Sequence, residues 1–563
     1  MSAPSDARRT GRGLVAGLIT GFVAVSAGQL VAGIARPQGS PVAAVGSMAI
    51  DFTPPAVKSF AISTFGSHDK LVLVSGVLVV LAVFAAMIGA LAMRRLRYGL
   101  AGLAVFAVIG LVAALTRPNA EVVDALPTLF GAAAGAFALS QLVRTANIAT
   151  AAAGASGRGA PAGLGAPAGQ GRPAGLGGGG APVGDADGSG SEVPPRPPFV
   201  AGPPRPLAPL AARRSFLVTS SVAVVAGGVG LVGARTLTER STATIARSAV
   251  RIPAAASHAP ALPPGTDFKI SGLSPFITPN DAFYRVDTAL LIPQVTTQNW
   301  RLRIHGMVER EINISFAELL RRPLIEDYVT LTCVSNPVAG PYVGNARWLG
   351  PSLASLLRSA GIRAGADQLL CTSTDGFTSG TPVEVIMDGR DALLAVAMNG
   401  VALPFAHGFP VRMVTPGLYG YVSATKWLTD IKVTTFGAET AYWVQRGWSQ
   451  RAPIKTESRI DVPSGGSVKA GRTPVAGVAW AQHKGIDAVH VRVNRGPWQQ
   501  ARLATVPGID TWRQWVWEWD ATPGQHTIEA RATDATGYTQ TADQAPTEPN
   551  GATGYPSVSV TVT

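Results

Sequence analysis

Four apolar stretches near the start of the chain constrain its fold more than any other feature. They lie at Gly13–Ala35, Leu71–Met93, Tyr98–Leu115 and Leu126–Val143. Each is close to the ~20 residues that an α-helix needs to cross a hydrocarbon layer of ~30 Å. Residues 1–145 are therefore predicted to form a four-helix transmembrane domain in contact with membrane lipid.

The charges beside these stretches predict their orientation. Arginines precede the first stretch, fill the turn between the second and third, and follow the fourth: Arg8, Arg9, Arg12, Arg94, Arg95, Arg97 and Arg144. Lys and Arg are enriched in cytoplasmic loops, so these positions and the N-terminus are predicted to be cytoplasmic. Basic residues exceed acidic ones by 20 to 9 through residue 250, but by only 27 to 25 after it. The net charge of +13 therefore fits membrane topology, and no nucleic-acid partner is expected.

The spans contain no histidine and almost no charge. A haem held between helices by paired histidines is therefore not expected, and intramembrane polar residues that would mark a transport path are missing. An anchoring or assembly bundle is favoured over a transporter with a sensor domain.

Residues 146–212 are rich in Gly, Pro and Ala and cannot bury enough apolar surface to fold, which predicts a disordered cytoplasmic linker. Residues 213–240 begin with "RRSFL" and continue into the apolar run Val218–Ala234, a predicted fifth transmembrane helix. The motif resembles a twin-arginine export signal; two ordinary positive-inside arginines are the alternative. A fifth crossing places everything beyond residue 240 outside the cytoplasmic membrane.

Beyond residue 264 the pattern becomes globular. Trp300–Val308 alternates like a strand, and Ser315–Arg322 and Pro351–Ile362 carry helix-capping residues. Residues 265–437 are therefore predicted to form an α+β domain. Residues 438–563 read as a β-sandwich. Its alternating Trp515, Trp517 and Trp519 are interpreted as core residues rather than as a stacking site for sugars or bases.

The two cysteines cannot form a disulfide framework and have to be explained singly. Cys333 follows the strand pattern "DYVTLT" and precedes Pro337, and a free cysteine in such a place is most often a small buried hydrophobe. Cys371 is interpreted as structural. His407, Arg412 and Lys426 lie among glycines and prolines and would suit a large phosphorylated ligand.

Several motifs in a fixed order add a second reading: "LSPFITPNDAFYRVDTALLIP", Cys333, "ARWLGPSLASLLRSAG", "MNGVALPFAHGFPVR", "KWLTDIKV" and "EARATDATGYTQ". From about Ser274 onward the chain resembles the sulfite oxidase-type molybdopterin oxidoreductases. The resemblance implies a molybdenum–molybdopterin cofactor with Cys333 as the protein ligand of the metal. It also implies cofactor contacts from Tyr284, Arg285, Thr374, His407, Arg412, Ser423, Thr425 and Lys426.

The resemblance makes residues 265–437 the molybdopterin-binding catalytic domain and residues 438–563 an immunoglobulin-like sandwich of the kind that mediates homodimerisation. The expected fold is thus multi-domain: a transmembrane helical bundle, an α+β catalytic domain and a β-sandwich. Certain residues depart from the family pattern. No arginine follows Cys333 in "CVSNPVAG", and "TDGFTSGTPVEV" has no tyrosine. Arg347 is then the expected catalytic polar group near the metal, with a surface ion pair as its alternative role.

The function predicted from these features is oxygen-atom transfer on a small substrate, either sulfite-like or an S- or N-oxide. Electrons would pass to or from a separate partner such as a quinone or cytochrome. No haem or iron–sulfur cluster is expected, because no C-x-x-C-H site or cysteine cluster is present. The alternative is a catalytically degenerate, non-enzymatic surface protein for adhesion or assembly.

Overall fold

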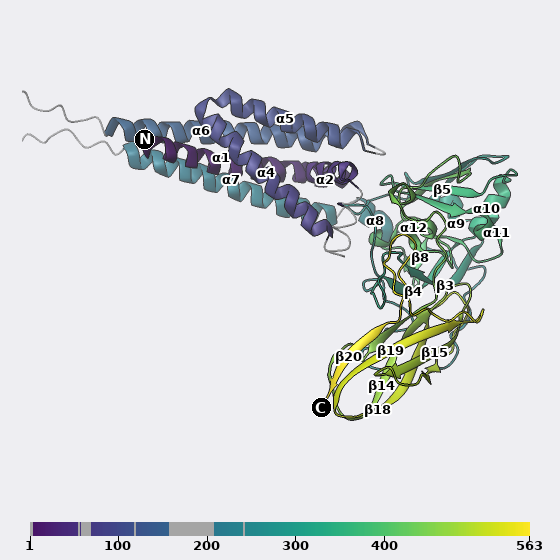
Figure 1. The fold of residues 1–563 in the computed structure, drawn as a ribbon. Helices are drawn as coiled ribbons and strands as arrows, with labels where there is room; N and C mark the ends of the chain where they lie inside the picture. The colour runs from purple at the N-terminus through teal and green to yellow at the C-terminus, as the bar shows by residue number, and fades with distance from the viewer. Residues whose placement is uncertain (1–3, 55–56, 58–68, 118–119, 157–207, 240–241) are drawn as a thin grey trace, which may run out of the picture. The chain divides into compact units, whose positions relative to one another are not determined.

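The structure is a computed structural model and describes residues 4–54, 57, 69–117, 120–156, 208–239 and 242–563 (Figure 1). Its N-terminal part is helical. The α-helices are α1 (Pro4–Ile34), α2 (Pro41–Phe52), α4 (Asp69–Arg94), α5 (Leu96–Leu115), α6 (Leu126–Ser156), α7 (Ala208–Glu239) and α8 (Thr242–Ser248), with short 3-10 helices η1 (Pro37–Gly39) and η3 (Val122–Ala125).

Four helices within the described residues are long and apolar enough to cross a membrane: Thr10–Ile34, Val72–Arg94, Leu96–Leu115 and Val122–Asn147. They coincide with the four predicted spans, which are therefore confirmed as helices of sufficient length and hydrophobicity. The predicted fifth span falls within α7, where the described apolar part, Leu217–Gly233, is shorter.

The predicted linker boundaries were wrong at both ends. Helix α6 continues to Ser156 because its last residues, "ATAAAGAS", are mostly alanine, the strongest helix former. Helix α7 already begins at Ala208. The rest of the predicted linker, residues 157–207, lies outside the described residues. Helix α2 was not predicted from the sequence, although Ser40 caps its N-terminus and Pro41 occupies its first position.

Helices α1 and α4 approach each other closely through glycines. A Cβ atom on Gly17 would lie 2.0 Å from the backbone oxygen of Ala85, and one on Gly89 would lie 2.1 Å from that of Gly13. Neither position has room for a larger residue. Small residues at such spacing let helix backbones meet in lipid, where apolar burial between helices gives little driving force.

The α+β region contains three sheets. The first has the order β2-β1-β11-β5-β6, in which β1 and β11 are parallel and the other neighbours antiparallel. The second has the order β3-β4-β8-β9, and β10 pairs with β7 in the third. The strands are β1 (Arg301–Gly306), β2 (Ile312–Ser315), β3 (Leu324–Thr332), β4 (Val343–Pro351), β5 (Gln368–Ser373), β6 (Thr378–Pro382), β7 (Leu393–Ala395), β8 (Ala397–Met398), β9 (Val401–Ala402), β10 (Arg412–Val414) and β11 (Leu428–Thr434).

The helices of this region are short: α9 (Phe316–Leu320), α10 (Leu353–Ala360), α11 (Val383–Met387) and α12 (Gly420–Ser423), with 3-10 helices η4 (Phe405–His407) and η5 (Val444–Arg446). The two predicted helices are confirmed as α9 and α10. Ser315 and Glu318 form the expected capping box, and Gly361 ends α10 with a left-handed φ of 72°. Cys371 is fully buried in the core, as the structural interpretation requires.

The C-terminal region, drawn in yellow and light green in Figure 1, is formed by two sheets. Their orders are β12-β14-β18-β17 and β13-β20-β19-β15-β16. Trp515 and Trp519 from one sheet and Ile528 and Val560 from the other lie in a single hydrophobic core, which confirms a two-layer sandwich and the core role of these tryptophans. The strands are β12 (Glu457–Val462), β13 (Gly466–Val468), β14 (Gly471–Trp480), β15 (Ile486–Val493), β16 (Gln499–Gln500), β17 (Arg502–Leu503), β18 (Arg513–Ala521), β19 (Gly524–Asp534) and β20 (Ser557–Val562).

Candidate active site

Cys333 directly follows β3, at the point where the β3–β4 ladder ends. The ladder pairs every residue of β3 and closes with Thr332 opposite Val343. The Cys333 amide then donates to the carbonyl of Tyr342 at 2.9 Å, and the Asn336 amide donates to the carbonyl of Cys333 at 3.0 Å. This turn holds the thiol in a fixed place. Cys333 is only 9% exposed, and it lines a pocket.

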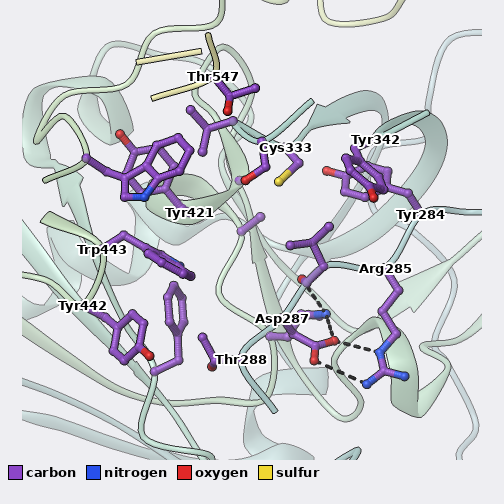
Figure 2. A pocket seen from close by; sticks show the side chains of 18 of the residues that line it. Tyr284, Arg285, Asp287, Thr288, Cys333, Tyr342, Tyr421, Tyr442, Trp443 and Thr547 are labelled. Carbon is purple, nitrogen blue, oxygen red and sulfur yellow. Dashed lines mark hydrogen bonds and ion pairs between the residues drawn. The ribbon is translucent and has the colours of Figure 1, made fainter. Parts of the chain in front are cut away.

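The pocket collects side chains from segments that are far apart in the sequence. Tyr284, Arg285 and Asp287 come from the loop before β1, and His407 comes from η4. Two further basic residues are Arg412, at the start of β10, and Lys426, just before β11. Figure 2 shows Cys333 between two groups of residues, with Tyr284, Tyr342 and Arg285 on one side and Tyr421, Trp443 and Tyr442 on the other. Six predicted site residues line this pocket: Tyr284, Arg285, Cys333, His407, Arg412 and Lys426.

One buried carboxylate joins two of these cations. The Asp287 carboxylate, whose side chain is 4% exposed, lies 2.8 Å from Arg285 Nε (Figure 2). It also lies 2.7 Å from Lys426 Nζ. Arg412 is 5% exposed, and its guanidinium donates to the carbonyls of His407 and Ala424, each at 3.2 Å. No carboxylate of the described chain lies within ion-pair distance of Arg412. Two of the three cations therefore share one close acid and the third has none, which leaves this side of the pocket positively charged.

Burial shapes the protonation of these groups. It lowers the pKa of Arg412 to about 10 and that of Lys426 to about 8, the latter against the opposing effect of Asp287. Burial, reinforced by Arg412, lowers the pKa of His407 to about 4, so its ring is neutral at pH 7. Its Nε2 then donates to the carbonyl of Asn280 at 2.8 Å.

The Cys333 thiol is also affected by burial, which raises its pKa. Hydrogen bonds from Ser335 and the charge of Lys426 act in the opposite direction. A buried thiol of this kind becomes a thiolate when it binds a metal, because ligation releases the proton.

The structure does not bring four predicted residues to the pocket lining. The Arg347 Nε atom lies 3.3 Å from the Glu326 carboxylate, and the Arg347 side chain is 38% exposed and does not line the pocket. The ion-pair alternative is therefore the arrangement observed, and a catalytic role of Arg347 stays a prediction. The Thr374 hydroxyl donates to the carbonyl of Trp427 at 3.0 Å. The Ser423 hydroxyl donates to the carbonyl of Leu418 at 2.9 Å, and the Thr425 hydroxyl lies 2.6 Å from that of Ser379. These three hydroxyls hold the backbone around the site.

Sequence reasoning missed Asp287 and most of the aromatic side of the pocket. The spacing of Arg285 and Asp287, two residues apart on an extended segment, could have indicated the first. Tyr442 and Trp443 were missed because they lie beyond residue 437, the predicted end of the catalytic domain. The cluster "AYWVQRGW" (441–448) was the available signal.

The fold and the site together place one buried cysteine in a pocket that has a positively charged side. Residues 289–443 match the family model described as "Oxidoreductase molybdopterin binding domain". Sulfite oxidase of Gallus gallus is 30% identical in an alignment 296 residues long that covers 44% of this chain and 63% of that protein. The uncharacterized oxidoreductase YuiH of Bacillus subtilis (strain 168) is 30% identical over 152 residues, 27% of this chain and 73% of the relative.

Among solved structures, the sulfane dehydrogenase SoxCD from Paracoccus pantotrophus aligns with a TM-score of 0.42 at 24% identity. The alignment covers 48% of this chain and 75% of that chain. This likeness is too weak to carry an argument.

The chain belongs to the sulfite oxidase-type family of oxidoreductases with a molybdopterin-binding domain. It spans 63% of the length of the chicken sulfite oxidase and 52% of that of the mouse enzyme.

Proposed function

We propose that this protein is a membrane-anchored molybdenum-cofactor oxidoreductase that transfers one oxygen atom to or from a small substrate. The observation that carries the proposal is the meeting of Cys333 with Arg285, Arg412 and Lys426 in one pocket. The position of the thiol and the excess of positive charge support a metal bound beside a phosphorylated pterin.

The residues fit such a cofactor. A thiolate is a soft ligand suited to a transition metal that also has sulfur ligands from a pterin dithiolene. Within the described residues, the hydrogen bonds of the buried Arg412 guanidinium go to backbone carbonyls, although a buried charge is costly without a counter-ion. A phosphate group would supply that counter-ion. Arg412 and Lys426 would hold the phosphate, and Tyr284 and His407 would border the pterin.

When bound, molybdenum would supply the two-electron redox change that the chain's own side chains cannot perform. The chain would orient the cofactor through Cys333 at one end and Arg412 and Lys426 at the other. The ring of His407, fixed by its hydrogen bond to the carbonyl of Asn280, is neutral and would add no positive charge to the site. The buried position of Cys333 would limit access of water to the thiol.

Two kinds of substrate are open. Sulfite-like oxidation adds one oxygen from water and releases two electrons and two protons; reduction of an S- or N-oxide consumes two electrons and two protons and releases water. No arginine follows Cys333 in "CVSNPVAG", and Arg347, the expected polar group near the metal, is paired with Glu326 outside the pocket. This weakens the case for sulfite and supports the S- or N-oxide option.

The electrons would come from or go to a separate redox partner, such as a quinone or cytochrome. The cofactor domain would lie outside the cytoplasmic membrane, with the N-terminus and the predicted linker inside. Arginines at the predicted cytoplasmic ends of the long apolar helices support this orientation. The "RRSFL" motif is proposed as the export signal, and the immunoglobulin-like sandwich as a homodimer contact.

Metal analysis tests the proposal. Purified wild-type chain should contain about one molybdenum atom per chain, as expected for one thiolate site. Cys333→Ser should lose the metal or bind it with one sulfur ligand fewer, measured by X-ray absorption. Cys371→Ser, which changes the other buried cysteine, should keep both metal and sulfur count. A folded wild-type chain without molybdenum would overturn the proposal and favour the non-enzymatic alternative.

Labelling tests the orientation. A cysteine introduced in place of Gln170, in the predicted linker, should be protected in intact cells from a membrane-impermeant maleimide. A cysteine in place of the exposed Gln499 should react. The reverse pattern would contradict the proposed topology, and the two native cysteines are buried and give little background.

A further inference from the structure

Five aromatic rings form a continuous chain along one side of the pocket: Phe377, Tyr442, Trp443, Trp448 and Tyr421. We call this set the aromatic wall. The ring centroids of neighbours along it are 5.9, 5.1, 6.2 and 6.0 Å apart in that order. These separations lie in the range of favourable edge-to-face contacts between aromatic rings.

The aromatic wall is held in place from behind. The Tyr421 hydroxyl donates to the carbonyl of Ser449, and the Trp448 amide donates to the carbonyl of Trp443 at 3.2 Å. The Tyr442 amide donates to the Thr378 hydroxyl at 3.0 Å, and the Arg446 guanidinium lies 3.6 Å from the centre of the Tyr442 ring. Rings fixed in this way lose little conformational freedom when a ligand packs against them.

The charges of the pocket are unevenly divided. Of the described lining residues, the cations are Arg285, Arg412 and Lys426, and all three belong to the side that would bind the cofactor phosphate. Figure 2 shows Arg285 across the pocket from Tyr442 and Trp443. The other acidic lining residues, besides Asp287, are Asp375 and Glu548. With an anionic cofactor in place, an anionic substrate would find carboxylates and rings but no further cation among the described lining residues, since Arg446 lies against the Tyr442 ring without lining the pocket.

We propose that the aromatic wall binds a neutral substrate with a flat apolar group, namely an aromatic S-oxide or N-oxide, rather than an inorganic oxyanion. This inference rests on the proposed function and names the substrate class of the same site. Apolar and aromatic pocket surface favours such a group, whereas a desolvated anion without a partner is disfavoured. The reaction consumes two electrons, supplied by the redox partner, and two protons: the bond from oxygen to sulfur or nitrogen breaks, and the oxygen leaves as water. An S-oxide becomes a thioether, and an N-oxide becomes the parent amine.

Binding can be measured apart from turnover. We would titrate the metal-loaded full chain in detergent with methyl phenyl sulfoxide, dimethyl sulfoxide or sulfite by isothermal titration calorimetry. Methyl phenyl sulfoxide should bind about two- to tenfold more tightly than dimethyl sulfoxide, since one ring–ring contact contributes a factor in that range. Sulfite should bind more weakly than either.

Two variants make the test specific to the aromatic wall. Trp443→Leu should lose most of the preference for methyl phenyl sulfoxide, and the milder Trp443→Phe should keep part of it. Trp498→Leu is the matched control, because Trp498 is also half-buried and lies 4.4 Å from the Arg492 guanidinium, but does not line the pocket. It should leave the preference unchanged.

Turnover adds a separate comparison, with reduced methyl viologen as the electron donor. A higher kcat/KM for methyl phenyl sulfoxide than for dimethyl sulfoxide is expected in the wild type and in Trp498→Leu. If the chain contains molybdenum with Cys333 as ligand but prefers sulfite, or binds all three compounds equally, the aromatic-substrate inference is wrong and the proposed function stands. If the chain contains no molybdenum, the proposed function itself fails.

Discussion

The ammonium of Lys426 lies 2.7 Å from the Asp287 carboxylate, which also binds Arg285. A single acid, 4% exposed at its side chain, thus compensates two cations at the edge of the candidate cofactor site. The sequence places Asp287 and Lys426 139 residues apart. Their contact fixes the loop before β1 against the segment that leads into β11, so two segments of the candidate cofactor site share one support.

Asp287→Asn should therefore destabilise the protein strongly. The substitution removes the counter-ion that Arg285 and Lys426 share and leaves Lys426 with the carbonyl of Val286 but no carboxylate of the described residues. Breaking a buried ion pair costs about 3–5 kcal/mol. Thermal unfolding can be followed by intrinsic tryptophan fluorescence, because all 11 tryptophans lie at or after residue 300. Glu311→Gln is the control: it breaks the exposed pair with Arg303 and should cost less than about 1 kcal/mol. Equal losses in the two variants would contradict the importance of burial.

The sequence was most informative where local chemistry decides the structure. Ser315 with Glu318, and Gly361 after an amphipathic stretch, predicted α9 and α10 because capping depends on residues within one turn. The lengths of the four apolar helices followed from hydrophobicity alone. The end of α6 did not, since a Gly- and Ala-rich composition suits both a linker and a helix end.

Site residues were predictable only in part, because a sequence motif does not determine the direction in which a side chain points. The motif resemblance placed Cys333, His407, Arg412 and Lys426 in one site, and the structure brings them together. It could not show which way a side chain points. Arg347 lies on β4, opposite Tyr328, and its side chain turns to Glu326 instead of the pocket. Such orientation depends on strand register, which is a tertiary property.

Glu457, in β12, gives a pH-dependent prediction. Burial raises its pKa to about 8, with Lys455 opposing, so the folded state holds a proton that the unfolded state releases near its ordinary pKa. Between about pH 4.5 and pH 8, Glu457 is protonated in the folded state but ionised in the unfolded state. The free energy of unfolding of the wild type therefore falls as the pH rises through that window. Glu457→Gln should remove this fall.

The expected result is a variant similar to wild type near pH 4.5 and more stable by on the order of 3–5 kcal/mol above pH 8. The difference in unfolding free energy between variant and wild type at the two pH values is the measurement, because other titrating groups largely cancel in it. Glu518→Gln, at a pair on the surface, should show a small difference that does not grow with pH. A constant difference for Glu457→Gln would refute the buried, protonated state.

Gly17→Ala tests the close contact of α1 with α4. The new methyl group would lie 2.0 Å from the backbone oxygen of Ala85, and backbone cannot move aside as a side chain could. The two helices must separate, at a cost of about 1–3 kcal/mol. The loss should appear as lower thermal stability of the detergent-solubilised chain in size-exclusion chromatography after heating. Gly76→Ala, also in a long apolar helix but with nothing within 4 Å of its Cβ position, should be neutral.

Arg412 and Arg347 should differ sharply when each is replaced by methionine. Arg412 is 5% exposed, lies over the Trp348 ring at 5.0 Å and lines the pocket, whereas Arg347 forms a half-exposed ion pair outside it. Arg412→Met removes the proposed phosphate contact, so molybdenum and pterin per folded chain should fall about tenfold or more, which corresponds to one lost charge-assisted hydrogen bond. Arg347→Met should keep both molybdenum and pterin and lose less than about 1 kcal/mol of stability.

Metal analysis measures the molybdenum content of each variant, and pterin fluorescence after oxidation measures the pterin content. Full retention of cofactor in a folded Arg412→Met chain would show that the buried guanidinium serves only the packing around Trp348.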